Sequence, residues 1–121
     1  MWERATHDLV THRGGAVQLL EQSGGLDSHA LLERLIAEGA VVLARREGAL
    51  VGFAVVRARV IEGLFVERAL RRTGVARSLV TQLMTWPEPP LDARVLPGDR
   101  AMKSLFESFG WKARLLTMRG A

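Results

Sequence analysis

The 121-residue sequence contains no cysteine and no tyrosine. Without cysteine, the chain has no disulfide, no thiolate nucleophile and no cysteine-ligated zinc site. Without tyrosine, it has no phenol that could donate a proton. No run of about 18 apolar residues is present, so no membrane-spanning helix is expected. The start, Met1 to Arg4, leads into polar sequence and lacks the apolar stretch of a signal peptide. We therefore expect a soluble, cytoplasmic protein.

Lysine is also scarce, since 15 of the 17 basic residues are arginine and only Lys103 and Lys112 are lysine. The formal net charge is +4. The planar guanidinium can donate two hydrogen bonds to one phosphate, so an anionic ligand or a nucleic acid would suit this bias. The excess as a whole is nevertheless typical of solvated surface arginines, and only clustered arginines indicate a function.

Hydrophobic residues make up 48% of the chain, which is enough for one core. We expect a single domain over residues 1–121. The first half predicts two helices, over residues 6–22 and 28–38, because apolar residues recur at helical spacing. Three strands are predicted next, over residues 41–45, 50–56 and 60–66, with turns at Glu47–Gly48 and at Arg57–Arg59.

The second half predicts a helix over residues 75–86, a short strand over 91–96, a helix over 99–109 and a last strand over 111–118. Asp99 is expected to cap its helix. The order is then α-α-β-β-β-α-β-α-β. This order predicts the α/β (α+β) class, with a mixed, mostly antiparallel sheet flanked by helices.

The junction between the third strand and its helix is the most informative stretch. A turn that contains Arg71, Arg72 and Gly74 opens the helix there. A helix N-terminus carries unpaired N–H groups and a partial positive charge, and phosphate binds to it readily. Glycine lets a ligand approach the backbone closely. The alternative is a plain helix-start glycine flanked by solvated arginines.

These residues resemble the GNAT superfamily of N-acyltransferases. Its cofactor loop follows the pattern Arg/Gln-x-x-Gly-x-Gly/Ala, and Arg71-Arg72-Thr73-Gly74-Val75-Ala76 fits at every defined position. The preceding Leu64-Phe65-Val66 resembles the family's strand end, whose backbone pairs with the pantetheine arm. The stretch from Ala101 to Trp111 is similar to the family's closing helix and its glycine-aromatic pair. The resemblance covers about residues 40 to 118.

The resemblance implies an N-acetyltransferase with acetyl-CoA as co-substrate, in which a primary amine of a small molecule or peptide attacks the thioester directly. It also implies that the third strand and the strand at Leu91 splay apart to admit the cofactor. The residues that it assigns to cofactor binding are Leu64, Phe65, Val66, Arg71, Arg72, Thr73, Gly74, Val75 and Ala76.

The sequence departs from the family where a proton donor is often found. Phe106 stands at the position of the frequent tyrosine, and phenylalanine cannot donate a proton. Water or another group would then protonate the thiolate, or the thiolate, with a thiol pKa near ~8.5, would leave with little help. The N-terminal part is also short, and it leaves little room for the family's first strand, whose presence the sequence does not decide.

An amine with a pKa near ~10.4 must lose a proton before it attacks, so a base is needed. We predict Glu62 for this role, with its side chain on the same face as Leu64 and Val66 by the strand period of two. A solvent-facing strand residue is the plain alternative. His7, His12 and His29 are further candidates for the base, although surface positions suit them better. They are not spaced as metal ligands, and no metal site is expected.

Two other functions fit the sequence. A catalytically weakened, acyl-CoA-binding regulatory module is suggested by Phe106 and by the short N-terminal part. An RNA- or tRNA-associated basic protein is suggested by the arginines, although the chain lacks interleaved base-stacking aromatics. The sequence does not identify the acceptor. An incomplete sheet edge would also favour a homodimer.

Overall fold

The computed structural model describes residues 1–11, 28–86 and 90–120. The first helix, α1, spans Trp2–Thr11 and so begins earlier than the predicted residue 6, while residues 12–22 of that prediction lie outside the described part. The second helix, α3, spans Ser28–Ala37, as predicted. Gly39 follows it with φ +69°, the left-handed conformation that ends many helices. None of the helices in the described ranges is long and apolar enough to cross a membrane.

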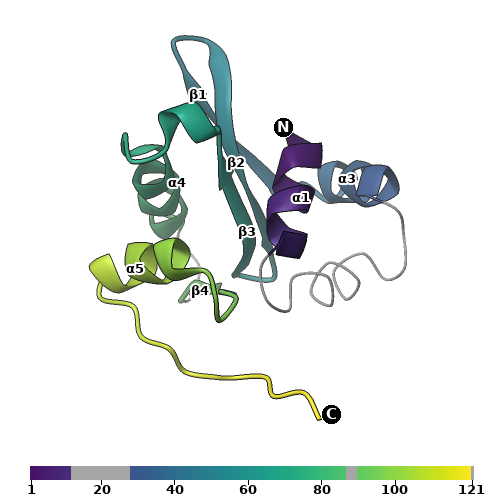
Figure 1. Cartoon of the computed structure of the whole chain (residues 1–121). Helices are drawn as coiled ribbons and strands as arrows, with labels where there is room; N and C mark the ends of the chain where they lie inside the picture. The colour runs from purple at the N-terminus through teal and green to yellow at the C-terminus, as the bar shows by residue number, and fades with distance from the viewer. Residues whose placement is uncertain (12–27, 87–89, 121) are drawn as a thin grey trace.

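A four-stranded sheet with the order β1-β2-β3-β4 forms the centre of the fold (Figure 1). Strands β1 (Val41–Arg46), β2 (Ala49–Arg57) and β3 (Val60–Val66) form the predicted antiparallel meander. The turn between β1 and β2 falls at Glu47–Gly48, as predicted, with positive φ at both residues. The short β4 (Asp92–Ala93) adds in parallel to β3. The predicted fold class is therefore confirmed.

Helices cover both faces of this sheet (Figure 1). On one face, α3 and α1 cover a buried cluster in which Leu31 and Leu35 pack on Phe53 and Phe65. On the other face, α4 (Val75–Met84) and α5 (Arg100–Ser108) cover a second cluster. Its buried members are Ala54, Val56, Ile61, Val80, Leu83 and Phe106. Successive β2 residues alternate between the two clusters, as the strand period of two requires.

A β-bulge in β3 changes the face on which Glu62 lies. Val56 pairs with Ile61 but Val55 pairs with Gly63, so Glu62 is the extra residue of β3. Ile61 and Leu64 both pack in the cluster under α4 and α5. Glu62 lies on the opposite face, where it contacts Arg57. The prediction that Glu62 shares a face with Leu64 and Val66 was wrong, because a strict period of two does not allow for a bulge.

The strands β3 and β4 stay together over only a short distance. Val60 pairs with Asp92 and Ile61 with Ala93, and the last backbone bond runs from the Arg94 N–H to the Ile61 carbonyl, at 2.9 Å. Beyond that bond, β4 ends while β3 continues to Val66. The expected divergence between the third strand and the strand at Leu91 is therefore present, and it exposes one edge of β3.

The C-terminal part follows the prediction only as far as α5. Asp99 caps this helix, as expected, by accepting a hydrogen bond from the Met102 N–H at 3.1 Å. The last strand, predicted over residues 111–118, was wrong: residues 111–120 form neither helix nor strand. Leu115 is 83% exposed and Leu116 75%. Because strand propensity depends on neighbours and burial, an apolar run with neither does not become a strand.

Gly52 lies where β2 and β3 come too close for a side chain. A Cβ at this position would lie 2.6 Å from the Phe65 carbonyl oxygen, which belongs to the sheet backbone. We expect Gly52→Ala to lower the free energy of unfolding by about 1–3 kcal/mol, because the strands must move apart. Gly63→Ala is the matched control, since a Cβ there meets nothing within 4 Å. Urea denaturation measures both, and equal losses would contradict the steric explanation.

Candidate functional site

The turn between β3 and α4 ends in an uncapped helix N-terminus. The turn contains a short 3-10 helix, η1 (Arg68–Leu70), and α4 begins at Val75 with Gly74 as its N-cap residue. Gly74 has φ +93° and ψ +3°, a left-handed conformation that favours glycine. The first helical bond runs from the Ser78 N–H to the Gly74 carbonyl at 2.9 Å. The prediction that a helix starts directly after Gly74 is therefore confirmed.

The first turn of α4 offers its amide groups to a ligand. Gly74 makes no side-chain cap, and the N–H groups of Val75, Ala76 and Arg77 have no acceptor within the helix. A Cβ built on Gly74 would meet nothing within 4 Å, so the space above it is open. Free amides, the positive end of the helix dipole and an open approach together suit a phosphate group.

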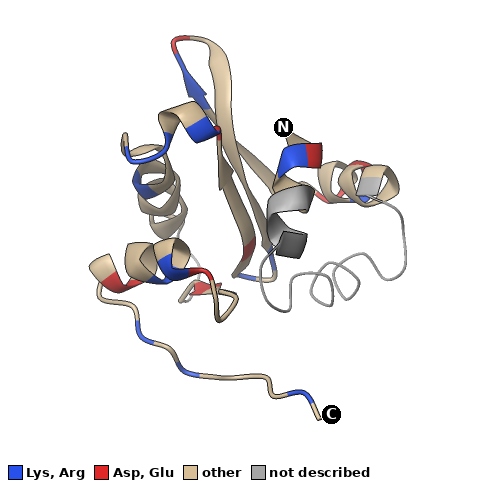
Figure 2. Cartoon of the chain, in the orientation of Figure 1, with Lys and Arg blue, Asp and Glu red and all other residues tan. Residues whose placement is uncertain are grey.

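The loop that precedes Gly74 is held in place from β1. Arg46 donates from Nη1 to the Thr73 hydroxyl oxygen at 3.1 Å and from Nη2 to the Thr73 carbonyl at 3.3 Å. The Thr73 hydroxyl in turn donates to the Leu70 carbonyl. Figure 2 shows basic residues at the end of the β1–β2 hairpin and along this loop. The sequence pattern missed Arg46, because its contact with Thr73 spans 27 residues and depends on the hairpin's position.

Arg71 fastens the same loop to the open edge of β3. Its Nε donates to the Val66 carbonyl at 2.9 Å, and its guanidinium carbon lies 5.4 Å from the centre of the Phe65 ring. These contacts suit a residue that positions the loop. Arg72, next along the chain, is exposed and has φ +66°.

The open edge of β3 presents backbone groups as well as side chains. The Glu67 N–H donates to the Val51 carbonyl, so this residue faces β2. Leu64 and Val66 alternate with it and therefore direct their backbone groups to the opposite edge, which agrees with the Val66–Arg71 bond. Leu64 thus has its N–H and C=O at the divergence of β3 and β4.

The apolar side chains predicted in the cofactor site contribute mainly to the core. Phe65, Val66 and Val75 are each at most 7% exposed. Val66 and Val75 pack together in a small cluster with Ala76 against it. What these residues can offer a ligand is therefore backbone amides and carbonyls, held in place by the buried side chains.

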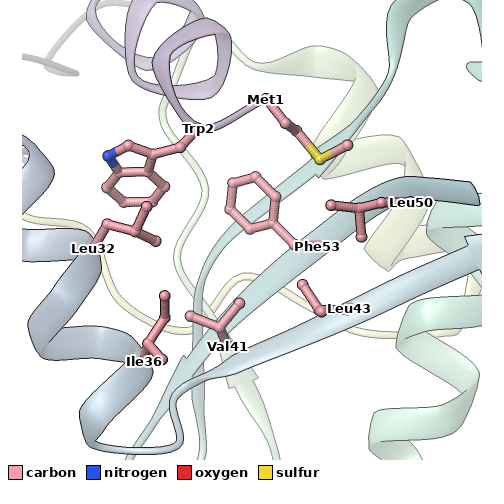
Figure 3. A pocket seen from close by; sticks show the side chains of 8 residues that line it. All are labelled: Met1, Trp2, Leu32, Ile36, Val41, Leu43, Leu50 and Phe53. Carbon is pink, nitrogen blue, oxygen red and sulfur yellow. The ribbon is translucent and has the colours of Figure 1, made fainter.

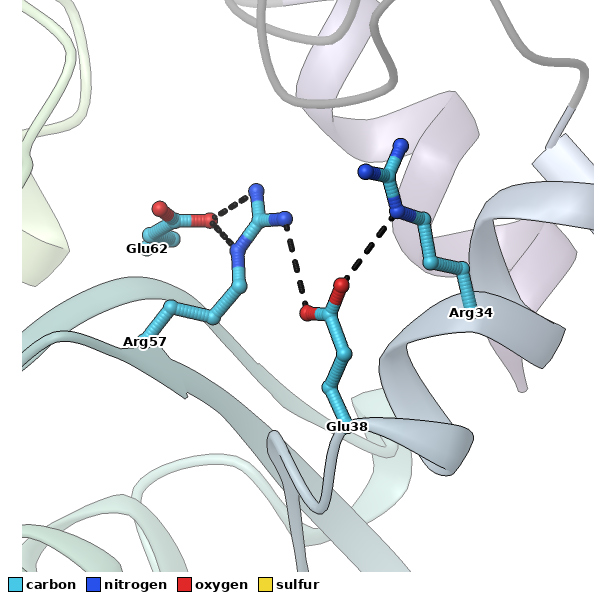
Figure 4. Close-up of polar contacts among 4 residues, drawn as sticks. All are labelled: Arg34, Glu38, Arg57 and Glu62. Atoms are coloured by element: carbon cyan, nitrogen blue, oxygen red, sulfur yellow. Dashed lines mark hydrogen bonds and ion pairs between the residues drawn. The ribbon is translucent and has the colours of Figure 1, made fainter.

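Glu62 belongs to a chain of charged groups beside α3 (Figure 4). Arg57 donates from Nε at 3.0 Å and from Nη2 at 2.8 Å to one oxygen, Oε2, of Glu62. Nη1 of Arg57 lies 3.8 Å from Glu38, which also pairs with Arg34 at 3.3 Å. The Glu62 side chain is only 11% exposed. A carboxylate held this firmly has a fixed position next to the bulge of β3.

The histidines and Phe106, the other residues considered for proton transfer, lie away from Glu62 or outside the residues that the structure describes. His29 is exposed and lies 3.8 Å from Glu3. His12 and the side chain of His7 lie outside the described part. Phe106 is buried and stacks on Trp111, with 4.9 Å between ring centres. Within the described residues, no group of three histidine or acidic side chains is placed to hold a metal ion.

Comparisons with solved structures give the same fold. An aminoglycoside N-acetyltransferase, AAC(6')-Iy, in complex with CoA is 18% identical with a TM-score of 0.61, covering 85% of this chain and 84% of its own. Diaminobutyrate acetyltransferase from Paenibacillus lautus is 22% identical with a TM-score of 0.53, covering 77% and 67%. Ribosomal-protein-alanine N-acetyltransferase from Brucella melitensis is 23% identical with a TM-score of 0.53, covering 87% and 79%.

Sequence comparisons complete the assignment. No curated protein matches the chain. The family model described as "Acetyltransferase (GNAT) domain" matches residues 23–114, which include the uncapped N-terminus of α4 and the open edge of β3. The chain therefore belongs to the GNAT acetyltransferase domain family.

Proposed function

We propose that this chain is an N-acetyltransferase that moves the acetyl group of acetyl-CoA to a primary amine. The observation that carries the proposal is the uncapped, open N-terminus of α4 at Gly74, directly beside the free edge of β3. Solved neighbours of the same fold support it, because their names describe acetyl transfer to amines and several hold CoA.

Groups of this chain fit two parts of the cofactor, the diphosphate and the pantetheine arm. The amides of Gly74, Val75 and Ala76 bind the diphosphate, and the exposed Arg72 adds positive charge. The N–H and C=O of Leu64 pair with the amide groups of the pantetheine arm, as an added strand would. Arg71 and Arg46 hold the loop in the conformation that presents these amides.

The reaction then needs two proton movements. The neutral amine nitrogen forms a bond to the thioester carbonyl carbon, the carbon–sulfur bond breaks, and the thiolate of CoA leaves. Glu62 accepts the proton that the amine loses, directly or through one water. Backbone N–H groups at the edge of β3 stabilise the negative charge on the carbonyl oxygen. Water protonates the thiolate, because Phe106 has no proton to give.

The second candidate function is acyl-CoA binding without transfer, and the position of Phe106 favours it. This side chain is buried against Trp111 and offers no acid to the leaving group. Such a module would bind acetyl-CoA with the same loop and release it unchanged.

Calorimetric titration with acetyl-CoA, followed by a thiol-release assay with a panel of amines, tests both proposals. We expect binding and an amine-dependent release of CoA. Binding without release for any amine would favour the regulatory module. No binding of acetyl-CoA would remove the basis for both.

A further inference from the structure

An apolar pocket opens on the face of the sheet that α1 and α3 cover (Figure 3). It has a volume of about 320 Å³, within the usual range for small-molecule sites. Helices α1 and α3 form one wall, and the β1–β2 hairpin forms the other. The side chains that line it are those of Met1, Trp2, Leu32, Ile36, Val41, Leu43, Leu50 and Phe53.

Several of these side chains are unusually exposed for their type. Ile36 is 60% exposed, Leu43 50% and Leu50 39%, and they come from three different elements. Scattered exposed apolar residues are ordinary, but convergence on one hollow indicates a binding site. An apolar group that entered the pocket would remove their surface from water.

The lining contains no charged side chain and no hydroxyl or amide side chain. Glu33, which follows Leu32 in α3, is exposed and does not line the pocket, and Glu38, just after α3, faces Arg34 and Arg57. A polycationic acceptor such as an aminoglycoside would find no carboxylate among these side chains. The pocket therefore suits a hydrocarbon group, for which apolar contact supplies the affinity.

A line of aromatic rings connects the pocket with the edge of β3. The rings of Trp2 and Phe53 are 5.9 Å apart, and those of Phe53 and Phe65 are 5.8 Å apart. Phe53 and Phe65 are cross-strand partners, and Phe65 is followed by Val66 at the open edge. Glu62 lies on the same face as this pocket, because the bulge in β3 turns it toward α3.

We infer that this pocket holds the apolar group of the acceptor, so that the acceptor is a primary amine carried on an aromatic or branched hydrocarbon group. The inference rests on the proposed function and adds the class of substrate. In this arrangement the hydrocarbon group lies beside Phe53, whose cross-strand partner on β3 is Phe65.

A comparison of acceptors tests this inference. We expect 2-phenylethylamine to have a kcat/KM at least about tenfold above those of 2,4-diaminobutyrate and neamine, since small changes in apolar contact alter selectivity by such factors. Leu43→Gln keeps the side-chain size and is expected to raise KM for 2-phenylethylamine about tenfold, with kcat little changed. Leu115→Gln is the matched control, because Leu115 is 83% exposed and lies outside the pocket. Ile36→Gln repeats the test from α3.

A binding measurement separates this inference from the proposed function. Saturation-transfer NMR with 2-phenylethanol, which has no amine, reports occupancy of the pocket without any transfer. Binding that Leu43→Gln weakens and Leu115→Gln does not shows that the pocket takes a hydrocarbon group even if no amine is acetylated, and together with acetylation of 2-phenylethylamine it supports the inference. Equal binding by all variants, or a preference for neamine or 2,4-diaminobutyrate, would overturn it while leaving the acetyltransferase proposal intact.

Discussion

Gly74→Glu is expected to weaken acetyl-CoA binding by about 100-fold or more. The new carboxylate would stand at the N-cap of α4, accept hydrogen bonds from the first-turn amides and place a negative charge where the diphosphate binds. Juxtaposed like charges cost several kcal/mol, and each 1.4 kcal/mol corresponds to about tenfold in affinity. Isothermal titration calorimetry with acetyl-CoA measures the loss.

The control for this variant must reproduce its backbone strain, because any side chain at φ +93° is unfavourable. Gly110→Glu does so, since Gly110 has φ +83° and a Cβ there also meets nothing within 4 Å. We expect Gly110→Glu to lower the melting temperature to a similar extent and to leave acetyl-CoA affinity unchanged. Gly74→Ala, which adds strain without charge, should bind with only a few-fold loss. Normal binding by Gly74→Glu would contradict the placement of the diphosphate.

Local sequence patterns predicted the parts of the site that are themselves local. The unpaired amides of α4 follow from a strand, a glycine and a helical apolar stripe that stand next to one another in the chain. The same holds for the cap by Asp99 and for the turn at Glu47–Gly48. In each case the residues that define the feature lie in one continuous stretch of the chain.

The features that the sequence did not predict depend on contacts between distant segments. The bulge at Glu62 arises from the register between β2 and β3. One extra residue shifts the alternation of β3, so that side chains before and after the bulge no longer follow one period of two. Arg46 reaches Thr73 only because the hairpin extends beside the loop. The apolar pocket joins α1, α3 and two strands, and no single stretch of sequence contains it.

The predicted last strand illustrates the opposite error. The residues from Trp111 to Met118 include apolar residues such as Leu115 and Leu116, which favoured a strand. A strand also needs a neighbouring strand, and in the described ranges residues 111–120 join no sheet; the Trp111 N–H donates instead to the Phe106 carbonyl at the end of α5. The ion pair from Arg114 to Asp92, at 3.4 Å, joins exposed side chains and contributes little.

Glu62→Gln is expected to lower kcat by about 100-fold or more, with acetyl-CoA affinity unchanged. Glutamine has the same shape and its amide oxygen can still accept from Arg57, so the side chain keeps its position beside the bulge. It cannot accept the proton of the amine, and general-base catalysis is worth about 10² to 10⁴-fold. Steady-state kinetics with a saturating amine measures the change.

Glu38→Gln is the matched control. Glu38 is the second carboxylate beside Arg57, at 3.8 Å, and it is more exposed than Glu62. Its replacement also removes one negative charge next to the same guanidinium. We expect kcat to change by less than about fivefold, because surface pairs contribute at most about 1 kcal/mol. An equal loss of kcat in Glu38→Gln and Glu62→Gln would mean that the negative charge beside Arg57 matters, and not proton transfer to Glu62.

Acceptors of different basicity distinguish two roles for Glu62, that of a general base and that of a side chain that only holds Arg57 in place. A β,β-difluorinated 2-phenylethylamine has the shape of the parent amine but is far less basic, so much more of it is neutral at pH 7. If Glu62 removes the proton, the effect of Glu62→Gln should shrink strongly with this acceptor, because less deprotonation is needed before the nitrogen attacks. A loss of the same size for both amines would assign Glu62 to positioning, since a displaced backbone affects both acceptors alike.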